Sequence, residues 1–243
     1  MTRLRIIAWG LAAGMLAAAP AEAADRVASV AESPFSSEPG VAPGHLALVD
    51  LIHALDRVTH SSTRIVLRPF ARSLKDTAAG LADFHLPFIQ DDDSQPPPGL
   101  LYVKEVDFGH SQFIIYSRKL APYDAKTVAT AKNVEAEPDH ESFFPFPVKA
   151  TYCVTCSLEK VLLGRTDAMI VAADVVDPLL SDPKYKEIHR ALYKIYPIRA
   201  LVPADRDSAA TRRYLVEGVR ELKESGELWK IMRHDIRYSD WQP

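Results

Sequence analysis

The sequence has little of the material from which catalytic and metal-binding motifs are built. Only two of its 243 residues are cysteine, its eight histidines are scattered, and neither G-x-S-x-G nor H-E-x-x-H occurs. A formal net charge of −3 gives no basic field that would attract nucleic acid. We therefore expect no enzymatic activity, no catalytic residues, no metal, no cofactor and no nucleic-acid partner.

Long apolar runs are also missing, except at the amino terminus. Arg3 and Arg5 precede an apolar run over residues 6–19, and the small residues of "AEAA" at 21–24 fit an A-x-A cleavage site. This pattern predicts that residues 1–24 are a secretory signal peptide, because the run is too short for a good spanning helix. An uncleaved membrane anchor is the alternative. We expect a periplasmic, soluble protein that is monomeric.

The first half of the mature chain alternates strand and helix patterns. Such alternation predicts right-handed crossover units and a mostly parallel sheet. The expected order is a strand at 26–30, a helix at 45–58, a strand at 63–67, a helix from Pro69 to a stop at Gly80, and a strand in "ADFHLPFI".

The second half contains a similar unit after two extended segments. "LLYVKEV" and "SQFIIYSRK" predict either an antiparallel pair or a crossover between lobes. The expected elements that follow are a weak helix near 125–132, a strand in "VKATYC", a helix at 157–163, a strand at 167–171, a helix at 174–180, a returning strand in "YPIRALVP", and a long helix broken at Gly226.

One 14-residue sequence pattern, called the repeated phrase below, occurs twice. "SLKDTAAGLADFHL" begins at Ser73 and "SLEKVLLGRTDAMI" begins at Ser157, with the serine, leucine, glycine and aspartate in the same places. Glycine ends a helix cheaply in the left-handed region, and an aspartate at the next strand accepts hydrogen bonds from backbone N–H groups. We interpret both copies as structural helix-to-strand corners of two α/β lobes.

Five passages in this order resemble the periplasmic solute-binding proteins of type II, the amino-acid-binding-like class called extracellular solute-binding protein family 3. They cover nearly all of the mature chain. The passages are "SPF" after the first strand, "PGHLALVDLIHAL", "RPFARSLKDTAAGLADFHLPFI", "SLEKVLLGRTDAMI" and "LVEGVRELKESGELWKIM".

The resemblance implies an α/β, two-lobed, periplasmic-binding-protein-like type II fold whose mostly parallel sheets are joined by two crossover strands. Lobe 1 would span 25–110 and lobe 2 would span 111–200, with the return strand and C-terminal helices of 201–243 packing mainly on lobe 1. Such proteins bind ligands in the crevice at the carboxyl ends of the strands, close by a hinge motion, and deliver the ligand to an inner-membrane transporter.

The sequence departs from the family at the positions that hold an amino acid. Where the family presents a carboxylate-binding Arg, this chain has "QDDDSQPPPG", and the ammonium-binding Asp is replaced by Ala172. An unpaired charge is costly to desolvate, so an ordinary α-amino acid is an improbable ligand. We expect a weakly charged ligand with a large apolar part, such as a lipid-like molecule.

Candidate ligand-binding residues lie near the expected strand ends. The guanidinium group of Arg72 is suited to bind a carboxylate or phosphate through two N–H groups. A solvent-exposed arginine at a helix start is an equally weighted alternative interpretation. The phenylalanines are often plain core, Asp174 is favoured as a helix cap, and "FFPFP" at 143–147 is expected to cover the cleft mouth. The candidates are Glu32, Phe35, Arg68, Arg72, Phe88, Tyr152, Ser157 and Asp174.

The two cysteines, Cys153 and Cys156, form a C-x-x-C motif. Haem attachment is excluded because Ser157 stands where a histidine is needed, and zinc lacks ligands, with His140 the nearest. A redox dithiol at a helix N-terminus is possible, but a local disulfide is favoured in an oxidising compartment. A dithiol oxidoreductase therefore stays open as an alternative function. The loss of the family's amino-acid-binding residues leaves a second alternative, a periplasmic accessory protein of the same fold that docks an exported enzyme.

Overall fold

The computed structural model describes residues 24–35, 37–38, 45–89, 95–138, 140–232 and 239–243. Residues 1–23 of the expected signal peptide therefore lie outside the described residues, as does part of the "QDDDSQPPPG" loop. Within the described ranges, no helix is long and apolar enough to cross a membrane.

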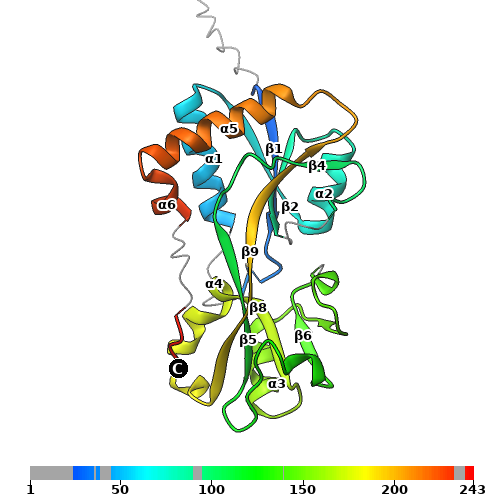
Figure 1. Cartoon of the computed structure of the whole chain (residues 1–243), viewed down its shortest axis with the longest axis vertical. Coiled ribbons are helices and arrows are strands. Elements are labelled where there is room, and N and C mark those ends of the chain that lie inside the picture. The colour runs from blue at the N-terminus through cyan, green and yellow to red at the C-terminus, as the bar shows by residue number, and fades with distance from the viewer. Residues whose placement is uncertain (1–23, 36, 39–44, 90–94, 139, 233–238) are drawn as a thin grey trace, which may run out of the picture.

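Lobe 1 is the upper body in Figure 1. Its three parallel strands lie in the order β2-β1-β3, and β4 adds to β9 beside them. The long helices α1 and α5 and the short helix α6 cover it, with the apolar stripe of α1 buried. The elements are β1 (Arg26–Glu32), α1 (His45–Thr59), β2 (Thr63–Pro69), α2 (Phe70–Ala78), β3 (Phe84–Ile89), β4 (Leu100–Tyr102), α5 (Ala209–Glu224) and α6 (Glu227–Met232).

Lobe 2 is the lower body and repeats the parallel arrangement. Its strands lie in the order β7-β6-β8, so β6 takes the central place that β1 takes in lobe 1. The elements are η1 (Val128–Thr130), β6 (Val134–Ala136), η2 (Glu141–Phe143), β7 (Lys149–Ala150), α3 (Val154–Leu162), β8 (Ala168–Ala172), α4 (Ala173–Val176), η3 (Asp177–Ser181) and η4 (Pro183–Tyr185).

Two long antiparallel strands connect the lobes, β5 (His110–Arg118) and β9 (Ile188–Pro203). β9 pairs with β3 and β4 in lobe 1, whereas β5 pairs with β8 in lobe 2. The predicted two-lobed α/β fold with two crossing strands is confirmed. Parallel pairing holds within each lobe, and the crossing strands run antiparallel to their neighbours.

Local predictions differ from the structure in three places. Of the two alternatives for "LLYVKEV" and "SQFIIYSRK", the antiparallel pair is not formed, because β4 pairs with β9, whereas the crossover between lobes is found, because "SQFIIYSRK" forms β5. The helix expected near 125–132 is only the 3₁₀ turn η1, and the helix expected at 174–180 is the short α4 followed by η3. Each misplaced helix lies in a short segment, where tertiary contacts outweigh weak propensity.

The repeated phrase marks equivalent corners, as predicted. Gly80 and Gly164 have φ values of +71° and +67°, which place both glycines in the left-handed region after α2 and α3. The Asp83 carboxylate accepts the Val27 N–H at 2.6 Å, and the Asp167 carboxylate accepts the Asn133 N–H at 3.0 Å. Both aspartates thus tie the start of one strand to the neighbouring strand, and neither is part of the site described below.

The last described residues, 239–243, contact lobe 2. Arg190 on β9 donates its N–H to Gln242 Oε1 at 3.0 Å, and its carbonyl accepts from Gln242 Nε2 at 2.8 Å. The Arg190 guanidinium pairs with Asp177 and lies 4.8 Å from the centre of the Trp241 ring. Helices α5 and α6 pack on lobe 1 while the end of the tail is held by lobe 2.

Candidate functional site

The carboxyl ends of the parallel strands of the two lobes face each other across the middle of the molecule (Figure 1). Ser33, just after β1, donates from its hydroxyl to Glu137 Oε1, just after β6, at 3.5 Å. Phe70 at the start of α2 meets His140 of lobe 2 edge to face, with ring centres 5.5 Å apart. Open α/β sheets bind ligands at these strand ends, so this junction is the candidate site.

Aromatic rings from both lobes line the junction. On the lobe 1 side, Phe70 stacks on Phe88 with ring centres 6.0 Å apart. On the lobe 2 side, His140 stacks on Phe143 at 4.6 Å. Aromatic pairs contribute beyond their buried area, so these four rings make the junction between the lobes apolar.

His140 is an uncharged member of this cluster. Burial lowers the pKa of His140 to about 4, so the ring is neutral at pH 7. Its Nδ1 lies 3.5 Å from Glu137 Oε2, and at neutral pH this is a polar contact and not an ion pair. A neutral imidazole has one N–H donor and one acceptor nitrogen, and so suits a polar, uncharged group.

His85 on β3 serves the interior of lobe 1. Its Nδ1 lies 2.6 Å from Ser73 Oγ, and the Ser73 hydroxyl is also 2.8 Å from Ser29 Oγ. Burial lowers the pKa of His85 to about 3, so it is neutral. His85 is therefore a structural histidine of lobe 1.

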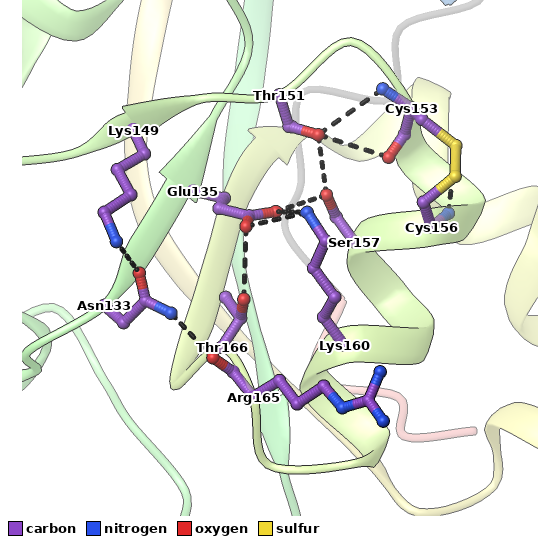
Figure 2. Close-up of polar contacts among 10 residues, drawn as sticks. All are labelled: Asn133, Glu135, Lys149, Thr151, Cys153, Cys156, Ser157, Lys160, Arg165 and Thr166. Carbon is purple, nitrogen blue, oxygen red and sulfur yellow. Dashed lines mark hydrogen bonds and ion pairs between the residues drawn. A yellow bond between two sulfur atoms is a disulfide. The ribbon is translucent and has the colours of Figure 1, made fainter.

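The equivalent place in lobe 2 holds a charged network (Figure 2). The Ser157 hydroxyl, buried on α3, donates to Glu135 Oε2 at 2.5 Å, and Thr166 donates to Oε1 at 3.2 Å. Burial acts to raise the pKa of Glu135, but the hydrogen bond from Ser157 and the pairing with Lys160 outweigh it, and the pKa is lowered. Ser157, a predicted ligand-binding residue, is therefore engaged in holding α3 to β6.

The first turn of α3 is set by the two cysteines and by a carboxylate from the other lobe. Cys153 and Cys156 are joined in a disulfide with Cα atoms 5.3 Å apart, as favoured from the sequence, and Cys153 Sγ accepts the Cys156 N–H. Glu38, in the turn after β1, accepts hydrogen bonds from Val154 N–H at 2.6 Å and Thr155 N–H at 3.1 Å. Anions are favoured at helix N-termini, where N–H groups lack partners.

The two candidate arginines pair with one acid inside lobe 1. Arg68 Nε lies 3.3 Å from Asp76 Oδ2, and Arg72 Nε lies 2.7 Å from Asp76 Oδ1. Both guanidinium groups remain about half exposed, and one shared carboxylate balances only part of their charge. They stay candidates for a ligand's acidic group, although each already has an anionic partner.

The other predicted residues occupy different surroundings. Phe35 is fully buried in the core of lobe 2, and Tyr152 is 72% exposed beside the disulfide. Glu32 ends β1, half-buried, whereas Phe88 does belong to the junction through Phe70 and also packs with Leu100 and Leu201 in lobe 1. Asp174 lies in the first turn of α4, whose N-cap is Ala172. The prediction that Asp174 caps this helix is therefore wrong.

Several residues of the junction were missed by reasoning from the sequence. Phe143 belongs to the "FFPFP" segment that was expected to cover the cleft mouth, and His140 was considered only as a metal ligand. For the other missed residues, the sequence offered only one indication of a role, their position next to a strand end or a helix start. The missed residues are Ser33, Glu38, Phe70, Glu137, His140, Phe143 and Thr155. Among the described residues, no group of three or more His, Cys, Asp or Glu could hold a metal ion.

No family model matches this sequence, and no curated protein does. Solved structures do match. The GluR0 ligand-binding core in complex with L-glutamate is 10% identical over 87% of this chain and 98% of its own, with a TM-score of 0.67. A substrate-binding protein of an amino-acid ABC transporter is 15% identical over 84% of this chain and 96% of its own, with a TM-score of 0.61.

A third match is ArtJ, the arginine-, lysine-, histidine-binding protein of Geobacillus stearothermophilus. It is 11% identical over 90% of this chain and 96% of its own, with a TM-score of 0.62. At these identities the matches show the fold. The chain has the two-lobed fold of type II periplasmic binding proteins, as the resemblance implied.

Proposed function

We propose that this protein is a periplasmic solute-binding protein that captures a small molecule between its lobes and passes it to a membrane transporter. The carrying observation is that strand ends of both lobes meet at one aromatic junction, where Phe70 faces His140. A solute held there would contact both lobes at once, and contacts made only in the closed form drive closure. Its role is binding and not catalysis.

We propose further that the solute has an apolar or aromatic part and few charges. The rings of Phe70, Phe88 and Phe143 support this, as does the neutrality of His140. The solved structures named above bind amino acids, so amino acids are the necessary comparison. Of the charged groups that a zwitterion would need, the guanidinium groups of Arg68 and Arg72 already pair with Asp76, and the Glu38 carboxylate already accepts hydrogen bonds from α3.

Thermal unfolding with a panel of solutes tests both proposals. A solute that binds only the folded state raises the melting temperature by mass action, and small-angle scattering reports any compaction. The panel contains the twenty amino acids, aromatic and aliphatic carboxylates, indole, and a sterol solubilised in detergent. A shift with the apolar members alone supports the ligand class. A shift with amino acids alone overturns the ligand class, and no shift with any member counts against solute binding.

Site variants then locate the binding. Phe70→Ala should raise the Kd of the bound solute about tenfold, because it removes one aromatic face of the junction. Leu120→Ala, at an exposed position in the turn after β5, is the matched control and should leave the Kd unchanged. Equal Kd values for both variants would place the solute elsewhere.

A second candidate function is favoured by one observation. Phe35 and Glu38 come from the turn after β1 in lobe 1, yet Phe35 is buried in the lobe 2 core and Glu38 caps α3. Because the chain itself contributes these groups between the lobes, we propose as the alternative an accessory protein that uses this fold to dock a periplasmic enzyme. Co-elution of a specific enzyme from native periplasm, in a complex that survives excess solute, would favour it.

A further inference from the structure

The turn after β1 reaches from one lobe to the other. Glu38 N–H donates to the Phe35 carbonyl at 2.9 Å, and Phe35 N–H donates to Ser33 Oγ at 3.3 Å, so the turn is ordered by its own hydrogen bonds. It is covalently part of lobe 1, since β1 precedes it and α1 follows it. The side chains of Phe35 and Glu38 nevertheless contact lobe 2.

Three donors of lobe 2 converge on one carboxylate of this turn. Val154 N–H reaches Glu38 Oε1 at 2.6 Å, while the N–H and the hydroxyl of Thr155 reach Oε2 at 3.1 and 3.0 Å. Both carboxylate oxygens are therefore used. Hydrogen bonds to an ionised group are roughly twice as strong as neutral ones, and the dipole of the nine-residue helix α3 adds to them.

The receiving end of α3 is held rigidly in place. The disulfide between Cys153 and Cys156 closes its first turn, and Ser157 ties the same turn to β6 through Glu135 (Figure 2). Thr151, just before the helix, is hydrogen-bonded to Ser157 Oγ at 2.7 Å. A donor set fixed in this way loses little conformational entropy when a carboxylate binds, so the contact is worth more.

We propose that Glu38 is an interlobe latch: its carboxylate, bound at the N-terminus of α3, holds the two lobes in the closed arrangement without help from a solute. The contact exists only when the lobes are together, so it biases the closed state by its whole free energy. Phe35, buried beside it in the lobe 2 core, adds apolar contact to the same arrangement. The latch rests on the fold and its contacts and is independent of the proposed function.

Closure of this protein is thereby set by a residue of its own chain. Opening requires Glu38 to leave three donors and return to water, and Val154 and Thr155 N–H groups then face the space between the lobes. Any event that favours the open form must compensate for that loss. The latch thus determines how much of the protein is open to partners or solutes at equilibrium.

The test measures the distance between the lobes in solution. Spin labels are placed at Leu81→Cys in lobe 1 and Leu163→Cys in lobe 2, which are 63% and 64% exposed and lie at the equivalent corners after α2 and α3. Distance distributions are recorded for the otherwise native protein and for Glu38→Ala and Thr155→Val, with no solute added. The matched control is Glu217→Gln, an exposed glutamate on α5.

Glu38→Ala should increase the ratio of open to closed molecules about tenfold or more, which appears as a longer-distance population. Thr155→Val removes one of the three donors and should give a smaller increase, and Glu217→Gln should give none. An unchanged distribution in Glu38→Ala overturns the latch. If Glu38→Ala does not fold, Glu38→Gln replaces it, and an unchanged distribution in both Glu38→Gln and Thr155→Val has the same consequence.

The outcome is separable from solute binding. A protein that opens on Glu38→Ala but binds no member of the solute panel has the latch without the proposed function. A protein that binds a solute but shows no opening has the function without the latch.

Discussion

Replacing His140 should remove a defined part of the acid sensitivity of the fold. The ring is buried at the lobe junction and burial lowers its pKa to about 4, whereas an unfolded chain protonates histidine near pH 6.5. Because the folded-state pKa is the lower one, the unfolded state binds more protons between these values. With respect to His140, the unfolding free energy is therefore at its maximum above about pH 6.5 and falls as the pH drops toward 4.

The magnitude follows from the difference between the two pKa values. One pKa unit corresponds to about 1.4 kcal/mol, so a histidine kept neutral by the fold costs about 2 kcal/mol of unfolding free energy at pH 5 relative to pH 7.5. His85, with a pKa lowered to about 3 by burial, adds a similar amount. His140→Gln keeps a polar side chain of similar size and should abolish only the His140 share.

Urea unfolding at pH 7.5 and at pH 5.0 measures this share. The loss between the two pH values should be about 2 kcal/mol smaller in His140→Gln than in the native protein. His53→Gln, at an exposed position on α1, is the control and should leave the loss unchanged. The reasoning is refuted if His140→Gln keeps the full loss, or if the His140 ring titrates in the folded protein with an NMR midpoint near 6.5.

Three further changes test the local structure that carries the site, with unfolding free energy as the measurement. Gly80→Ala should cost about 1–2 kcal/mol because φ is +71°, and Gly80→Asn should cost less; equal costs would contradict this. Glu135→Ala should cost about 2–3 kcal/mol by leaving two hydroxyls without their acceptor, against at most about 0.5 kcal/mol for Glu141→Ala. Serine at both Cys153 and Cys156 should cost at most about 2 kcal/mol and leave solute binding intact; lost binding would contradict this.

The elements that the sequence predicted well are those with strong local patterns. The buried stripe of α1 follows from apolar residues at helical spacing, and the glycine stops of α2 and α3 follow from the repeated phrase. The disulfide was favoured because two cysteines three residues apart were expected to lie in an oxidising compartment. The short elements of lobe 2 were placed poorly, since β6 and β7 have three and two residues and carry almost no periodicity.

The candidate site was predicted less well than the fold. Arg68 and Arg72 were expected to face a ligand, but both also pair with Asp76, a residue of α2 in the same lobe. Phe35 was placed correctly after the first strand, yet nothing local indicated that its ring enters the other lobe. Residue type and spacing identify which side chains stand at strand ends, but not which of them already have partners.

By itself the sequence determined the alternation of strands and helices, the two equivalent corners and the disulfide, because each depends on residues close together in the chain. Only the tertiary structure decided that Glu38 binds α3 across 116 residues, that Phe70 meets His140, and that Gln242 returns to Arg190. These contacts depend on how the lobes are oriented about β5 and β9. That orientation is the sum of many small packing terms, none of which a local pattern encodes.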